Sequence, residues 1–265
     1  MQPPSVRAYA APAAHGAISD LIRHHSTNRL DVRAVALVDV PVAAADRMLD
    51  LGCGFGFMAE GLAQRARPGS EIVGVDVAES NRDAFLSRVE AAGCRGRFVC
   101  REIDGGLDFL TGGFDVIAAS YSLYFFPGAA GAAAARLAPG GAFVAITHRE
   151  ESLRHLLDVL GLPPGEAPHL SVLHRCSAET GAAVLSPHFE DVELRRYPNS
   201  LAFGPGDAEA LLSYVRFKLP LIVSGFDVGS DVPDGIVRRV LAAFRERGRV
   251  NLDKDDAVFV CRRPR

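Results

Sequence analysis

The sequence predicts an α/β fold built on a mainly parallel, doubly wound sheet. Short apolar runs alternate with helical patterns along the 265 residues, an order typical of strand–helix–strand units. The central runs are nearly continuous in Val, Ile and Ala, as expected for strands covered on both faces. A glycine-rich segment directly follows the first run, at the edge where such sheets bind ligands. A chain of this length can hold one elaborated domain or two small ones.

Seven apolar runs are expected to form the strands of this sheet. They are residues 46–51, 71–76, 97–100, 114–120, 141–148, 191–197 and 257–263. Helices are expected between them, and residues 57–66 follow the glycines directly. Ser80 and Asp83 form a capping pattern before a second helix, which Gly93 is expected to end. A leucine stripe at helical spacing is predicted to pack on the core and consists of Leu153, Leu156, Leu157 and Leu160.

Two further helices are expected between the last two strands. The first covers residues 207–219, with Asp207 as its N-cap and Pro220 as its stop. The second covers residues 233–247 and has Pro233 at its first position. Both would lie over the ligand-binding edge of the sheet.

These elements suggest a division of the chain into three parts. We expect residues 1–45 to form an N-terminal helical lid and residues 201–250 a helical cap inserted before the last strand. The core then comprises residues 46–200 and 251–265. We expect the residues that select the acceptor or ligand to lie in the lid and the cap rather than in the core.

Composition excludes several classes of protein. The formal net charge of -3 and the lack of an extended basic run argue against binding to nucleic acid phosphates. Residues 116–135 are uncharged over a membrane-spanning length, but Pro127 and two glycines favour a strand, a loop and a helix instead. Five scattered cysteines without C-x-x-C spacing predict neither disulfides nor a metal site. With no secretory pattern at the N-terminus, a cytoplasmic location is expected.

The glycine-rich segment LDLGCGFGFMA, residues 49–59, points to the kind of ligand. Its D-x-G-x-G-x-G pattern allows a tight turn and close approach of a ligand. The second half also fits the G-x-G-x-x-A pattern of dinucleotide-binding proteins. Asp50 argues against that ligand, because a carboxylate there would repel a pyrophosphate and attract an ammonium or sulfonium group. Asp76 ends the next strand, where a ribose diol is normally held.

Four ordered segments together resemble class I S-adenosylmethionine-dependent methyltransferases, in particular bacterial small-molecule enzymes. They are LDLGCGFGF, GVD, FDVIAASYSLYFFP and LAPGG, all within residues 40–150. The resemblance implies a Rossmann-like, seven-stranded sheet with an antiparallel last strand. It also implies S-adenosylmethionine as cofactor, S-adenosylhomocysteine as product, and methyl transfer to an O, N or C nucleophile of a small-molecule acceptor.

The resemblance assigns roles to individual positions. Asp50 would hold the methionine part, Asp76 the ribose hydroxyls and Val77 the adenine ring. Glu102 or Asp104 would accept a hydrogen bond from the adenine amino group, and this choice stays open. The carbonyl of Ser120 would meet the methionine amino group. The full expected cofactor set is Asp50, Gly52, Cys53, Gly54, Gly56, Asp76, Val77, Glu102, Ile103, Asp104, Ser120 and Tyr121.

His148 and Tyr124 are the candidate catalytic residues. His148 ends the fifth expected strand and could act as a base or orient the acceptor. Tyr124 and Phe125 stand where related enzymes often carry histidines, which puts a histidine mechanism through that loop in doubt and leaves an aromatic wall. A base is needed only if the acceptor must lose a proton. A satisfied strand-end histidine and a pocket-lining tyrosine are the competing interpretations.

Residues of the added segments could also reach the acceptor. Tyr9 or a histidine of the N-terminal segment could touch the sulfonium or the acceptor, whereas His24 and His25 are expected at the surface. The segment YVRFK could shape an anionic or aromatic acceptor site, although amphipathic alternation explains it equally well. Its polar and aromatic members are Tyr214, Arg216, Phe217 and Lys218.

Three alternative functions compete with small-molecule methylation. The first is a non-methylating enzyme or binding module that holds the same cofactor, and the second is a nicotinamide-dependent oxidoreductase. The third, methylation of nucleic acid, is disfavoured by the charge and by SYSL in place of an N-P-P-Y tetrad. We expect no nucleic acid or membrane partner. The sequence leaves the oligomeric state open, a homodimer included.

Overall fold

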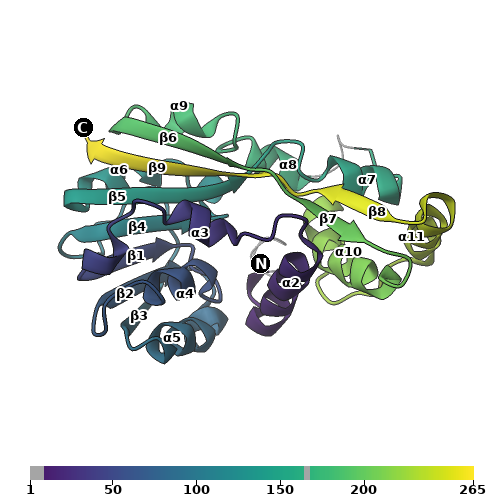
Figure 1. Cartoon of the computed structure of the whole chain (residues 1–265), viewed down its shortest axis with the longest axis horizontal. Helices are drawn as coiled ribbons and strands as arrows, with labels where there is room; N and C mark the ends of the chain where they lie inside the picture. The colour runs from purple at the N-terminus through teal and green to yellow at the C-terminus, as the bar shows by residue number, and fades with distance from the viewer. Residues whose placement is uncertain (1–8, 164–167) are drawn as a thin grey trace.

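The computed structural model describes residues 9–163 and 168–265 and is built on a seven-stranded mixed sheet (Figure 1). The strand order is β3-β2-β1-β4-β5-β9-β6. The first five strands pair in parallel, whereas β9 runs antiparallel between β5 and β6. This confirms the predicted doubly wound, Rossmann-like sheet with an antiparallel last strand. The order reverses between β1 and β4, and ligands bind at such reversals.

All seven predicted runs form strands of this sheet. They are β1 (Arg47–Leu51), β2 (Glu71–Asp76), β3 (Arg95–Cys100), β4 (Phe114–Ser120), β5 (Leu137–His148), β6 (Phe189–Tyr197) and β9 (Asp256–Pro264). β5 begins four residues earlier than predicted, because Leu137 pairs with Phe114 across a register shift.

Helices cover both faces of the sheet, and two apolar cores result. Alternate strand residues point to opposite faces, so Met48 belongs to one core and Leu49 to the other. One face is covered by α3 (Val32–Ala36), α4 (Phe57–Ala63) and α5 (Arg82–Ala91), and the other by α6 (Ala129–Ala135) and α9 (Gly181–Leu185). Gly74 of β2 admits Phe85 of α5, since a Cβ at residue 74 would lie 2.5 Å from the Phe85 ring.

The start of α5 differs from the prediction. The capping pattern of Ser80 and Asp83 is wrong, because a 3-10 turn, η2 (Glu79–Asn81), precedes the helix. The Ser80 hydroxyl instead donates to the Ala10 carbonyl oxygen at 2.6 Å. The loop after β2 is therefore tied to the N-terminal segment. Gly93 follows the helix with φ +78°, as predicted.

A second, smaller group of elements packs beside the main sheet and is called the cap below (Figure 1). It consists of α2 (Pro12–His25), α7 (Arg154–Leu160), β7 (Ser200–Phe203), α10 (Ala208–Ile222), α11 (Asp234–Arg247) and β8 (Val250–Asp253). The antiparallel pair β7–β8 was not predicted, because four-residue strands carry little periodicity. β6 leads into β7 and β8 into β9, so these two connections join the antiparallel pair β7–β8 to the sheet.

The cap has its own apolar core, which the predicted leucine stripe joins from α7. Two predicted helix boundaries are wrong. Pro220 lies inside α10 rather than at its end, where its missing N–H costs one hydrogen bond in the last turn. Pro233 is the N-cap residue of α11, which begins at Asp234. A short helix, α8 (Pro168–Leu173), lies against α10.

The uncharged stretch 116–135 folds as predicted from its glycines and proline. It forms most of β4, the 3-10 turn η3 (Leu123–Phe125) and α6. Within residues 9–163 and 168–265, every helix is too short or too polar to cross a lipid bilayer.

Candidate active site

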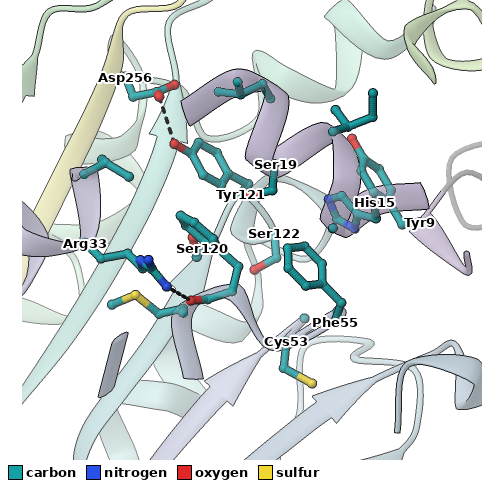
Figure 2. Close-up of a pocket in the computed structure, with 18 of the residues that line it drawn as sticks. Tyr9, His15, Ser19, Arg33, Cys53, Phe55, Ser120, Tyr121, Ser122 and Asp256 are labelled. Carbon is teal, nitrogen blue, oxygen red and sulfur yellow. Dashed lines mark hydrogen bonds between the residues drawn. The ribbon is translucent and has the colours of Figure 1, made fainter. Parts of the chain in front are cut away.

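A cavity of about 1080 Å³ lies between the carboxyl ends of the parallel strands and the cap. Its walls come from the glycine-rich loop after β1, the ends of β2, β4 and β5, and the helices α2 and α10. Figure 2 shows the part in which Tyr9 and His15 of the N-terminal segment face the loop. The strand-order reversal between β1 and β4 explains this position.

The glycine-rich loop turns through left-handed backbone conformations. Gly52 has φ +67°, and a Cβ there would lie 2.5 Å from the Ser122 Cβ. Gly54 has φ +49° and lines the cavity. Gly56 is not among the lining residues: it is the N-cap of α4 and packs on Phe85, and its expected cofactor contact stays a prediction.

Asp50, at the end of β1, presents a carboxylate that the protein only half satisfies. The side chain is buried, and Oδ2 accepts a hydrogen bond from the Ala59 N–H at 3.1 Å. Oδ1 has no hydrogen-bond partner in the described parts of the chain. Burial, aided by the nearby Asp76, raises the pKa of Asp50 to about 7. A buried, unpartnered oxygen of this kind indicates a place for a donor or cation from a ligand.

Asp76 joins the end of β2 to the glycine-rich loop. Its Oδ2 accepts from the Gly54 N–H at 2.9 Å, and its Oδ1 accepts from the Ala78 N–H at 2.8 Å and from Asn81 Nδ2 at 3.3 Å. The carboxylate lines the cavity, and Val77 beside it exposes 38% of its surface. An acid and an apolar surface therefore lie together where a ribose and a base would bind.

The two acids left open by the sequence differ in position. Glu102 and Ile103 line the cavity, close to Val77 along the same wall. Asp104 does not line it, and its Oδ1 accepts from the Gly106 N–H at 3.4 Å. The lining therefore favours Glu102 over Asp104 as the acid that faces the cavity, and the cofactor contact of either stays a prediction.

At the end of β4, Ser120 and Tyr121 face the cavity from adjacent positions. The Ser120 hydroxyl is buried and has no hydrogen-bond partner among residues whose placement is described. Tyr121 adopts φ +54°, a costly conformation for a bulky residue, and its N–H donates to the Ile146 carbonyl oxygen at 2.7 Å. Cys53 is buried nearby, and burial raises the pKa of its thiol, so the thiol stays protonated.

A buried polar cluster surrounds Asp256, the first residue of β9. The Tyr121 hydroxyl donates to Oδ2 at 2.8 Å (Figure 2), and Lys254 Nζ lies 2.6 Å from the same oxygen. His148 Nδ1 lies 2.7 Å from Oδ1. Three partners thus converge on one carboxylate, and the Lys254 charge with these hydrogen bonds lowers the pKa of Asp256 to about 2 despite its burial.

His148 is held in a defined orientation by this cluster. The Tyr121 ring stacks on the imidazole with centroids 4.6 Å apart. Burial, together with the Lys254 charge, lowers the pKa of His148 to about 4, so the ring is neutral at pH 7. With Nδ1 donating to Asp256, the lone pair is on Nε2, for which the described residues offer no hydrogen-bond partner. This is the geometry of a carboxylate-supported histidine base.

The carboxylate partner of His148, Asp256, was not predicted from the sequence. Asp256 lies opposite His148 in the antiparallel register of β5 and β9, more than a hundred residues further along the chain. The sequence predicted an antiparallel last strand, but it did not predict which residue of that strand pairs with His148. Lys254 lies just before β9, where the cap joins the sheet.

Tyr124 lies close to His148 but is almost completely buried. Its ring centroid is 6.3 Å from that of His148, and the residue lines the cavity. Burial raises the pKa of Tyr124, which keeps the phenol protonated. This favours a lining role, and catalysis by Tyr124 stays a prediction.

The helices α2 and α10 of the cap both line the cavity. Phe217 and Lys218 of α10 line it, and His15 of α2 stacks on Phe217 at 5.6 Å. Arg216 points away, with its guanidinium 3.8 Å from the Asp231 carboxylate. Burial and the Lys218 charge lower the pKa of His15 to about 4.

The two adjacent histidines of α2 have different environments. His24 is exposed, as expected. His25 is not a surface residue: its side chain is 8% exposed, and Nδ1 lies 3.1 Å from the Ala202 carbonyl oxygen. The ring also stacks on Phe203, so His25 fastens α2 to β7.

Comparison with known proteins adds independent evidence. Residues 48–141 match the family described as "Methyltransferase domain". Nocamycin O-methyltransferase of Saccharothrix syringae is 38% identical over 96 residues, which are 36% of this chain and 33% of that protein. The alignment thus spans a third of this relative's length.

Two solved structures share the fold at low sequence identity. A protein of Bacillus halodurans assigned as a methyltransferase is 14% identical with a TM-score of 0.56, over 88% of this chain and 99% of that one. The [4+2]-cyclase SpnF is 20% identical with a TM-score of 0.53, over 88% and 80% of the two chains. Residues 48–141 therefore match a methyltransferase domain, and the sheet order agrees with the Rossmann-like methyltransferase fold.

Proposed function

We propose that the protein transfers a methyl group from S-adenosylmethionine to a hydroxyl oxygen of a small-molecule acceptor. One observation carries the proposal: a buried carboxylate with one unpartnered oxygen, Asp50, and a carboxylate-supported neutral histidine, His148, line the same cavity. The first suits a cationic cofactor and the second suits an acceptor that must lose a proton. The similarity to an O-methyltransferase agrees with oxygen as the nucleophile.

The cofactor end of the cavity has the donors and acceptors that S-adenosylmethionine requires. Asp50 Oδ1 would accept a hydrogen bond from the ammonium of the methionine part. Asp76 would accept from the ribose hydroxyls, Val77 would pack on the adenine, and Glu102 would accept from its amino group. The Ser120 carbonyl remains the expected second acceptor for the ammonium. When bound, the cofactor supplies an electrophilic methyl group on a sulfonium.

At the acceptor end, His148 would act as the general base. Nε2 would take the proton of the acceptor hydroxyl as its oxygen bonds to the methyl carbon and displaces S-adenosylhomocysteine, whose sulfur keeps the electron pair of the broken C–S bond. Asp256 would keep Nδ1–H in place and stabilise the imidazolium that forms, as in other carboxylate–histidine pairs. Lys254 keeps Asp256 ionised, and the stacked Tyr121 ring fixes the imidazole plane. Holding the nucleophile in line contributes the remaining acceleration.

The test is transfer of a labelled methyl group. The wild-type protein is incubated with deuteromethyl S-adenosylmethionine and a metabolite extract, and products are analysed by mass spectrometry. We expect one or more products that carry the label, much less of them with His148→Ala, and intact S-adenosylhomocysteine binding by that variant. Tight S-adenosylhomocysteine binding without labelled product from the wild type would contradict methyl transfer.

That negative outcome would favour a second candidate, a non-methylating enzyme on the same fold. The fold shared with a [4+2]-cyclase is the observation behind it. A nicotinamide-dependent oxidoreductase is disfavoured, because the unpartnered Asp50 carboxylate beside the glycine-rich loop would repel a pyrophosphate. Binding of NAD(H) in place of S-adenosylhomocysteine would reverse this ranking.

A further inference from the structure

Lys218 of α10 is a buried cation that faces the cavity without a carboxylate partner. The residue is 8% exposed, and its ammonium lies 5.6 Å from the centroids of the Tyr214 and Phe217 rings. Across residues 9–163 and 168–265, no hydrogen bond or ion pair to Nζ is found. A buried charge is costly unless it is paired, so this ammonium is suited to an anion that a ligand brings.

The nearest acidic group cannot serve as that anion. Asp256 is already engaged by Lys254, His148 and Tyr121. His148 is neutral, so this end of the cavity has two ammonium groups and one carboxylate. The burial of Lys218 and its proximity to Lys254 lower its pKa to about 8, the direction expected for an uncompensated cation.

Asp50, Asp76 and Glu102 line the part of the cavity assigned to the cationic cofactor, together with Arg88 and Arg101. A negatively charged acceptor would pair with the Lys218 ammonium, which has no carboxylate partner of its own among the described residues. The walls of the cavity are rich in aromatic rings and suit a flat, unsaturated molecule. They include the rings of Tyr9, Phe55, Tyr121, Tyr124 and Phe217.

We infer that the acceptor is an aromatic or conjugated hydroxy acid, whose carboxylate pairs with Lys218 while its hydroxyl faces His148. This inference rests on the proposed function and names its substrate class. Lys218 and His148 come from the cap and the sheet respectively, so a molecule that bridges them is bound by both parts of the protein. Lys218 is then the residue that selects acids over neutral acceptors.

The experiment exploits an unusual property of the sequence. Lys218 and Lys254 are its only two lysines, so protein labelled with ¹³C-lysine gives two side-chain signal sets in NMR spectra. The probes are 4-hydroxybenzoate and 4-hydroxybenzamide, which differ in charge but hardly in shape, added to protein saturated with S-adenosylhomocysteine. The variant Lys218→Met assigns the signals.

We expect 4-hydroxybenzoate to shift the Lys218 signal and to bind at least tenfold more tightly than the amide, about the effect of one buried ion pair. Lys218→Met should bind both probes equally, and Lys218→Arg should keep the preference for the acid. Because Lys218→Met removes an unpaired buried charge, we expect its melting temperature to be no lower than that of the wild type.

Equal affinity for the two probes, no shift of the Lys218 signal, or retention of the acid preference by Lys218→Met would each overturn the inference. The measurement does not depend on turnover. Labelled methyl transfer without a preference for acids would therefore reject this inference alone. A lysine-dependent preference for acids without any methyl transfer would reject only the proposed reaction.

Discussion

Asp50 should release a proton when the cofactor product binds. At pH 7 a carboxyl with a pKa of about 7 is half protonated. The ammonium of S-adenosylhomocysteine, placed against the unpartnered Oδ1, should lower this pKa by about 2 units, as an opposite charge within hydrogen-bond distance typically does. Binding should then release about 0.8 proton at pH 6, about 0.5 at pH 7 and about 0.1 at pH 8.

Isothermal titration calorimetry measures this number directly. The binding enthalpy is recorded in buffers of different ionisation enthalpy, and the slope gives the protons released. Asp50→Asn is the matched control, because the amide keeps the shape but cannot ionise, and its slope should be near zero. His15 and His148 have pKa values of about 4 and stay neutral at pH 6 to 7. Equal slopes for wild type and Asp50→Asn would refute the assignment of Asp50 to the ammonium.

Other substitutions test the remaining assignments. Asp76→Ala should weaken S-adenosylhomocysteine binding by about 1–3 kcal/mol through loss of a charged acceptor, and unchanged affinity in calorimetry would reject the ribose contact. His148→Ala should lower the turnover rate more than it weakens cofactor binding, and unaltered turnover of this variant would make His148 structural. In the wild type the turnover rate should fall only as the pH drops through about 4, where His148 becomes protonated. The pKa of Asp50 is raised from 3.8 to about 7 in the folded protein, so the stability that Asp50 contributes below about pH 3.8 is lost as the pH rises through 7. At pH 8 the variant Asp50→Asn should therefore have a higher free energy of unfolding than the wild type, by up to about 4 kcal/mol in denaturant titrations. Gly52→Ala should lower both the melting temperature and the cofactor affinity, because its Cβ would overlap Ser122; wild-type values would show that the loop adjusts.

The cofactor end was predictable because its parts are local in the sequence. Asp50 and Gly52 follow one apolar run, and Asp76 and Val77 follow the next. The carboxyl ends of neighbouring parallel strands meet at one edge, so the pattern of runs already brings these residues together. Gly56 and Asp104 were assigned by pattern alone, and neither is among the residues that line the cavity.

The acceptor end depends on distant pairings that no local pattern encodes. His148 meets Asp256 only through the register of β5 with β9, and a shift by one residue would turn Asp256 to the other face. His25 becomes buried only because α2 packs on the unpredicted strand β7. The sequence places Lys218 on a helix. That its ammonium has no carboxylate partner in the described part of the chain is visible only once the positions of the surrounding acids are known.

The cofactor residues come from local sequence segments, whereas the acceptor residues are brought together by distant pairings. Cofactor affinity and acceptor choice should therefore be altered by different substitutions. Asp50 and Lys218 are not among each other's electrostatic partners. Charges that are not close neighbours interact weakly in a solvent-accessible cavity. Lys218→Met should therefore bind S-adenosylhomocysteine within about twofold of the wild-type affinity, since a twofold change is only about 0.4 kcal/mol. Asp50→Asn should in turn keep the preference for 4-hydroxybenzoate over its amide. A large effect of Lys218→Met on S-adenosylhomocysteine affinity, or of Asp50→Asn on the preference for the acid, would show that the two charges act on both ligands. The Lys218 charge alone would then not explain acceptor choice.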